Sequence, residues 1–222
     1  MISIATLTTL EHPEMIKTGT TTIGIVCKDG IVLAADKRVT AGNLIANRRF
    51  HKVFPITETM AVTVAGLVSD AQLISKLIKA ELKLKDLQTN RTSTVKEAAN
   101  LLAGMLYSNI RKMSMVQSVV GFLLGGKDES GYHLYDLGID GSTAEHEDFV
   151  SDGSGSVFAL GVLETLYKKG ISIDEGIKLA VKAVNAAIQR DNCSGNGIDV
   201  VTISASGAQQ VLEKEINTRL EL

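Results

Sequence analysis

The stretch that decides the fold runs from residue 19 to residue 40 and reads GTTTIGIVCKDGIVLAADKRVT. Residues 20–27 are apolar and rich in β-branched side chains, and a second apolar run covers residues 31–35. The Lys28-Asp29-Gly30 segment between them is typical of a tight turn, so the stretch predicts a β-hairpin. Because both faces of the two strands are apolar, we expect the hairpin to lie buried between two layers of structure.

The rest of the chain alternates between groups of strands and pairs of helices. Thr94 with Glu97 and Ser172 with Glu175 predict capping boxes at two helix starts. We expect the charged tail after residue 204 to be helical. In chain order, hydrophobic periodicity predicts strands at 53–55 and 60–66, helices along the stripes 73–82 and 95–106, strands at 118–125, 132–137 and 143–150, helices at about 157–168 and from 172, and a strand at 198–204.

This order of elements predicts an α+β fold. Consecutive strands are joined by short turns, so the sheets should be mainly antiparallel. A four-layer αββα sandwich, with two sheets between two helix pairs, would bury every apolar stripe. No internal repeat or linker divides residues 20–222, so we expect them to form a single domain.

Composition excludes several classes of protein. The 222 residues carry 23 basic and 25 acidic side chains, a net charge of −2, which argues against a general binder of nucleic acid or of membrane surfaces. No apolar run reaches the roughly 18 residues of a membrane span. The two cysteines are far apart in sequence, which argues against a secreted disulfide scaffold and favours the reducing cytoplasm.

Residues 1–19 differ from the rest because they are Thr-rich and lack clear periodicity. They have no basic n-region and so are a poor secretory signal. If the bond between Gly19 and Thr20 were cut, Thr20 would gain a free α-amine, and a nucleophile and its base would then reside in one residue. The alternative is that the leader is a frayed terminus and that Thr20 merely begins a strand.

Other catalytic and metal-binding motifs are weak. The Gly153-Ser154-Gly155-Ser156 segment is followed by valine and not by the lysine of a phosphate-binding loop. No G-x-S-x-G elbow supports a Ser-His-Asp triad. The spacing of the four histidines and two cysteines predicts no metal site.

The chain resembles a proteasome β subunit of the archaeal type, and the resemblance covers essentially everything after the leader. It rests on residues 19–24 (GTTTIG), 34–40 (AADKRVT), Lys52, 65–70 (AGLVSD), 153–156 (GSGS) and 189–191 (QRD), in family order. It implies an N-terminal-nucleophile hydrolase fold and a propeptide, residues 1–19, that is removed by autolysis. It also implies a threonine endopeptidase that needs no metal or organic cofactor.

The resemblance also implies a role for particular residues. Thr20 matches the nucleophile, Lys52 the catalytic lysine and Asp36 its acidic partner; the alternative for the last two is a surface ion pair. The amide of Gly66 matches the oxyanion donor, and Arg38 a structural neighbour of the site. The remaining matches are Ser154, Asp191 and Ser194 around the terminal amine, and Val39, Phe50, Val64 and Val68 in the wall of the substrate pocket.

Three residues near these motifs stand out as departures or neighbours. Cys193 lies beside the matched site and would be either a reactive thiol or a small buried filler. Phe50 is bulky for a pocket position. His51 precedes Lys52, but adjacent strand residues point in opposite directions, so we do not expect it to be catalytic.

The resemblance finally implies an assembly. The expected partners are other β subunits in a seven-membered ring, α subunits in enclosing rings, a separate ATP-dependent unfoldase, and unfolded polypeptides as substrates. Alternative functions are the bacterial two-component threonine peptidase, a non-catalytic ring subunit, and an amidase of the same fold that acts on a small molecule. The bacterial peptidase typically has Gly-Asp-Gly where this chain has Ala35-Asp36-Lys37.

Overall fold

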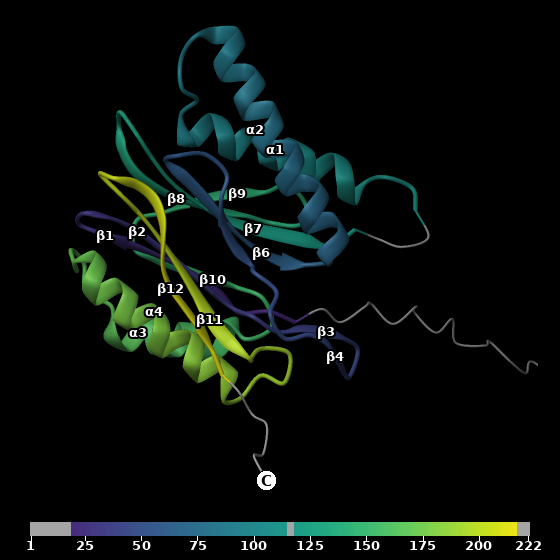
Figure 1. The fold of residues 1–222 in the computed structure, drawn as a ribbon, viewed down its shortest axis with the longest axis vertical. Coiled ribbons are helices and arrows are strands. Elements are labelled where there is room, and N and C mark those ends of the chain that lie inside the picture. Colours follow the sequence, from purple (N-terminus) through teal and green to yellow (C-terminus); the bar gives the residue numbers. More distant parts are fainter. Residues whose placement is uncertain (1–18, 115–117, 217–222) are drawn as a thin grey trace, which may run out of the picture.

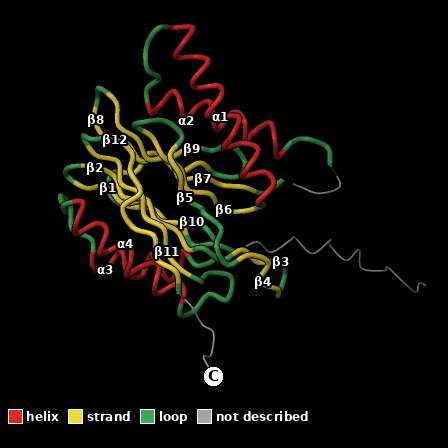
Figure 2. The backbone as a smooth tube through the Cα atoms, in the orientation of Figure 1, coloured by secondary structure: helices red, strands yellow, loops and turns green. Residues whose placement is uncertain are grey.

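Two antiparallel sheets lie face to face between two pairs of helices. The computed structural model describes residues 19–114 and 118–216. Figures 1 and 2 show α1 and α2 covering one sheet and α3 and α4 covering the other. The predicted α+β class and the four-layer αββα sandwich are therefore confirmed.

The first sheet contains the predicted hairpin at its centre. Its strand order is β10-β1-β2-β11-β12, with every neighbouring pair antiparallel. Cys27 pairs with Gly30, so a two-residue turn joins β1 to β2. The sheet comprises β1 (Thr22–Cys27), β2 (Gly30–Asp36), β10 (Phe149–Asp152), β11 (Gly197–Ser204) and β12 (Gly207–Glu215).

The second sheet has the order β5-β6-β7-β8-β9 and is also antiparallel. Residues such as Leu33, Leu123 and Leu134 form a fully buried core, as expected for two apolar sheet faces packed together. Its strands are β5 (Val53–Pro55), β6 (Met60–Gly66), β7 (Val120–Asp128), β8 (Gly131–Leu137) and β9 (Thr143–His146). A small hairpin of β3 (Val39–Ala41) and β4 (Leu44–Asn47) stands beside the sandwich.

The helices close the sandwich on both sides. They are α1 (Val68–Thr89), α2 (Val95–Ile110), α3 (Ser156–Leu166) and α4 (Ile173–Ile188). Both predicted capping boxes are present, at the starts of α2 and α4. None of the helices in the described part of the chain is long and apolar enough to cross a membrane.

Two predictions of secondary structure are wrong. The strand expected at 143–150 is two strands, since β9 pairs with β8 and β10 pairs with β1 in the other sheet. The polar Glu147-Asp148 pair lies at this crossing between sheets. The tail expected to be helical forms β12, because its pairing with β11 over the whole strand outweighs local propensity. The last residues of that tail, 217–222, lie outside the described residues.

Candidate active site

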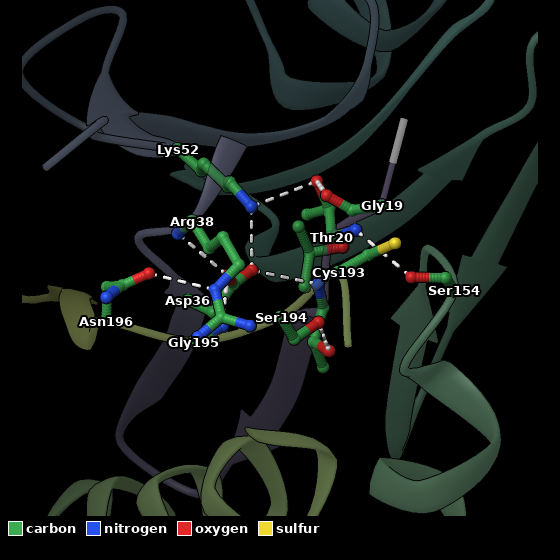
Figure 3. Close-up of polar contacts among 12 residues, drawn as sticks. Gly19, Thr20, Asp36, Arg38, Lys52, Ser154, Cys193, Ser194, Gly195 and Asn196 are labelled. Carbon is green, nitrogen blue, oxygen red and sulfur yellow. Dashed lines mark hydrogen bonds and ion pairs between the residues drawn. The ribbon is translucent and has the colours of Figure 1, made fainter. Parts of the chain in front are cut away.

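Thr20, Asp36 and Lys52 lie together at the end of β2, and Figure 3 shows the contacts that join them. Thr20 lies just before β1, Asp36 ends β2, and Lys52 directly precedes β5. Lys52 Nζ donates hydrogen bonds to Thr20 Oγ1 at 3.1 Å and to Asp36 Oδ1 at 2.8 Å. All three residues are buried, so the alternative of a surface ion pair between Asp36 and Lys52 is wrong.

The Asp36 carboxylate is held by four donors. Its Oδ1 accepts from Lys52 Nζ and, at 3.0 Å, from the Thr21 amide. Its Oδ2 accepts from the amides of Arg38 and Gly195, both at 2.9 Å. A carboxylate with this many donors is fixed in orientation, so it also fixes the direction in which Lys52 approaches Thr20.

The Lys52 ammonium is strongly desolvated. Burial lowers its pKa below the ordinary lysine value, although the nearby Asp36 carboxylate acts in the opposite direction. A lysine in this state stabilises negative charge on a neighbouring oxygen and releases a proton more readily than an exposed lysine. The oxygen in reach is Thr20 Oγ1.

The three residues predicted around the terminal amine do gather beside Thr20. The Thr20 backbone N–H donates to Ser154 Oγ at 3.3 Å. Ser154 Oγ and Ser194 Oγ each donate to Asp191 Oδ2 at 2.6 Å. The Thr21 hydroxyl lies 2.7 Å from Ser194 Oγ, which extends the network under the start of β1.

Gly66 lies at the end of β6 and lines the same cavity as Thr20 and Lys52. Its φ of +131° is a conformation that favours glycine. A Cβ at this position would lie 2.1 Å from the Val119 carbonyl oxygen. The site therefore requires glycine here, and the backbone of β6 can approach a bound substrate closely.

A small pocket, partly open to solvent, adjoins Thr20. All four predicted wall residues line it, so the structure brings Val39, Phe50, Val64 and Val68 together. Sequence reasoning missed Thr40 and Ala71, which line it as well. Ala71 follows Val68 by three residues in α1, and this helical spacing would have indicated it.

Cys193 packs against the residue before the nucleophile. It is partly exposed and is a free thiol, so it is not the small buried filler that was one of its two expected roles. A Cβ added to Gly19 would lie 1.7 Å from Cys193 Cβ and 2.9 Å from Ser154 Oγ. The structure therefore accommodates only glycine at position 19 without movement of its neighbours.

The loop after Asp191 is tied to the site by Arg38. The Arg38 guanidinium donates to Asn196 Oδ1 at 2.8 Å and to the Asn192 carbonyl at 2.7 Å. It thus positions the loop whose Gly195 amide binds Asp36. This agrees with the structural role expected for Arg38.

One group of possible metal ligands occurs among the described residues: His51, Asp199 and Glu213, whose ligand atoms lie within 4.8 Å of one another. The Lys37 ammonium lies 3.1 Å from Asp199 Oδ1 and 2.5 Å from Glu213 Oε1. A cation therefore already occupies the position between the carboxylates. The group is an ion-pair cluster, and His51 bonds Asp199 rather than Thr20.

Comparisons with known proteins show the family of the chain. The family model described as "Proteasome subunit" matches residues 16–203. A proteasome subunit beta of Ferroglobus placidus is 43% identical over 210 residues, which are 95% of this chain and 98% of the relative. One from Archaeoglobus profundus is 42% identical over 93% of this chain and 94% of the relative. One from Methanothermobacter thermautotrophicus is 42% identical over 91% of this chain and 95% of the relative. Because the family model and these relatives each cover most of the chain, the chain belongs to the proteasome subunit family.

Proposed function

We propose that this chain is the catalytic β subunit of a proteasome core particle, a threonine endopeptidase whose nucleophile is Thr20 Oγ1. The observation that carries the proposal is the buried contact between Lys52 Nζ and Thr20 Oγ1, with Asp36 holding the lysine. The three relatives described above, each named as a proteasome subunit beta, support it.

The reaction begins once Thr20 is the first residue. Its α-amine, with an unperturbed pKa of about 7.7–8.0, accepts the hydroxyl proton. Lys52 stabilises the oxyanion of Thr20 while that oxygen attacks the carbonyl carbon of the substrate. The C–N bond breaks, the amine leaves with a proton, and an ester remains on Thr20. Water then hydrolyses the ester and restores the hydroxyl. In this scheme Ser154, Asp191 and Ser194 orient the amine.

The backbone N–H of Gly66 is the proposed donor to the tetrahedral intermediate. A hydrogen-bond donor stabilises the negative charge of this intermediate most strongly when the donor is already held in place before the reaction. The close packing of Gly66 against Val119 and Val120 supports this role, because it leaves the β6 terminus little freedom.

The same hydroxyl is proposed to remove the leader. Before cleavage, Thr20 Oγ1 donates to the Gly19 carbonyl oxygen at 2.7 Å, so the nucleophile lies beside the bond to be cut. Intramolecular proximity favours this step. Attack on the Gly19 carbonyl carbon transfers the acyl group from nitrogen to oxygen, and water then releases residues 1–19. Residues 1–18 lie outside the described part of the chain, so the propeptide and the mature domain of residues 20–222 stay proposals.

Membership of the family places the chain among subunits that assemble with one another. We propose seven-membered β rings enclosed by α rings, an ATP-dependent unfoldase that delivers unfolded polypeptides, and a cytoplasmic location. A line of exposed leucines on α1 supports contact with another subunit: Leu73, Leu77, Leu84 and Leu87 repeat at the spacing of a helix-packing seam.

The test is the variant Thr20→Ala in the full chain. We expect assembled particles that keep the leader by intact mass and do not hydrolyse fluorogenic peptides. A particle of ring-assembly mass would also separate this function from that of a small amidase. A mature species that begins at residue 20 in purified Thr20→Ala protein, without another protease, would overturn the proposal.

A further inference from the structure

Lys37 is the largest fully buried side chain among the residues that the structure describes, although it is charged. Its Nζ lies 3.1 Å from Asp199 Oδ1 in β11 and 2.5 Å from Glu213 Oε1 in β12. Burial by itself lowers the pKa of Lys37, but the hydrogen bonds with Glu213 and Asp199 outweigh this effect and raise it. Lys37 is therefore an ammonium that joins β2 to two other strands.

His51 joins the same carboxylate from a different segment. Its Nδ1 lies 3.0 Å from Asp199 Oδ2, and its Nε2 lies 3.8 Å from Glu213 Oε1. Asp199 thus binds Lys37 with one oxygen and His51 with the other. We call Lys37, His51, Asp199 and Glu213 the rear cluster.

The rear cluster connects the two segments that carry the catalytic pair. Lys37 follows Asp36 directly, and His51 precedes Lys52 directly. In each segment one side chain faces Thr20 and its neighbour faces Asp199, as expected from the alternation of extended backbone. The Phe50 amide also donates to the Lys37 carbonyl at 3.2 Å, so backbone and side chains tie the segments together.

We propose that Asp199, with Lys37 and His51, is a positioning group that sets the distance from Lys52 Nζ to Thr20 Oγ1. The inference rests on the proposed function. Asp199 is buried and fixed in the central part of its sheet by pairing with Ala35. It therefore provides a rigid reference to which the segment bearing Lys52 is attached through His51. Without that attachment, the segment shifts and the approach of Lys52 to Thr20 loosens.

His51 is the residue that separates positioning from stability. Its side chain is 53% exposed, and the buried Asp199 carboxylate keeps the Lys37 ammonium as a partner when the imidazole is removed, so we expect a small change in the free energy of unfolding. The variant His51→Leu removes the donor to Asp199, whereas His51→Asn keeps an N–H near the position of Nδ1. Arg49→Leu is the matched control, because Arg49 is exposed, lies two residues earlier and pairs with Glu215.

The experiment measures kcat and KM for a fluorogenic peptide in assembled particles whose leader has been removed, together with thermal stability. We expect His51→Leu to lower kcat about tenfold, since small displacements of a catalytic group have large effects on rate. KM and the melting temperature should stay near wild type. We expect His51→Asn to recover most of kcat and Arg49→Leu to leave it unchanged.

Two results would overturn the inference: a wild-type kcat in His51→Leu, or an equal loss in His51→Asn and His51→Leu. Failure of the proposed function gives a different result. In that case wild-type particles would show no turnover that depends on Thr20, whatever residue stands at position 51.

Discussion

Replacing Lys52 by methionine should separate catalysis from stability. Methionine has a length similar to that of lysine and fills the same buried space, but it carries no charge. The variant loses the 3.1 Å contact with Thr20 Oγ1 and the 2.8 Å contact with Asp36 Oδ1. Losing a preorganised electrostatic contact to a developing oxyanion commonly costs at least about 10²-fold in rate. We therefore expect both leader removal and peptide turnover to fall by that factor or more.

The expected effect on folding is much smaller. An isolated carboxylate left behind in a protein interior costs about 3–5 kcal/mol. Asp36, however, keeps its hydrogen bonds from the amides of Thr21, Arg38 and Gly195. In addition, the lysine that is lost was itself desolvated, as its lowered pKa shows. We expect a loss of about 1–2 kcal/mol, which is a few degrees in melting temperature for a chain of this size.

The assay follows the leader by intact mass and turnover with a fluorogenic peptide. A second version of the variant that begins at Thr20 measures turnover independently of self-cleavage. Lys52→Arg should not restore activity, because the guanidinium is larger, planar and does not release a proton. Lys169→Met, at an exposed lysine, is the control for loss of a charge. Near-normal turnover by folded, assembled Lys52→Met would refute the role assigned to Lys52.

Three further predictions follow from the surroundings of the site. The apolar pocket wall should favour cleavage after Leu, Phe, Tyr or Met over Arg or Glu, because a charged side chain would be desolvated without a partner; equal or higher kcat/KM on matched Arg or Glu peptides would contradict this. Gly19→Ala should slow leader removal, measured by intact mass, and Cys193→Gly should restore part of it, because Cys193 Cβ lies 1.7 Å from the added Cβ; normal processing of Gly19→Ala would show that the contact is not limiting. Burial raises the pKa of Asp152 above 3.8, so the folded state binds that proton more tightly than the unfolded state, and ionisation destabilises the fold as pH rises above about 3.8. Asp152→Asn should therefore raise the melting temperature at pH 7, with a gain that shrinks towards pH 4; a gain independent of pH would count against this account.

Local signals in the sequence were sufficient for much of the fold. The hairpin of β1 and β2 follows from two apolar runs and a turn, and the capping boxes at Thr94 and Ser172 mark where helices begin. The signals failed where long-range pairing decides the structure. The crossing between β9 and β10 and the strand character of β12 depend on partners distant in sequence, and local composition does not contain that information.

The candidate site likewise has residues that the sequence identified and residues that only the three-dimensional structure brings together. The motif residues around Thr20 were identified by resemblance, and the structure brings them together. The rear cluster was not predicted, because Asp199 and Glu213 are more than 160 residues from Lys37. Nothing in their local sequence distinguishes them from other acidic residues of the chain. Their relevance appears only when the register of β2 with β11 is known.

The three consecutive charged residues Asp36, Lys37 and Arg38 explain why the site is built at the end of β2. Burying one charge is costly unless it is paired and hydrogen-bonded, and here each of the three has its own partners in a different direction. Asp36 bonds Lys52 on the Thr20 side, Lys37 bonds carboxylates on the opposite side, and Arg38 bonds the loop at residues 192–196. A strand end that must satisfy three charges in three directions has few alternative positions. The charges that make this segment unusual as a strand are therefore also what can hold a nucleophile, a lysine and a loop in one fixed arrangement.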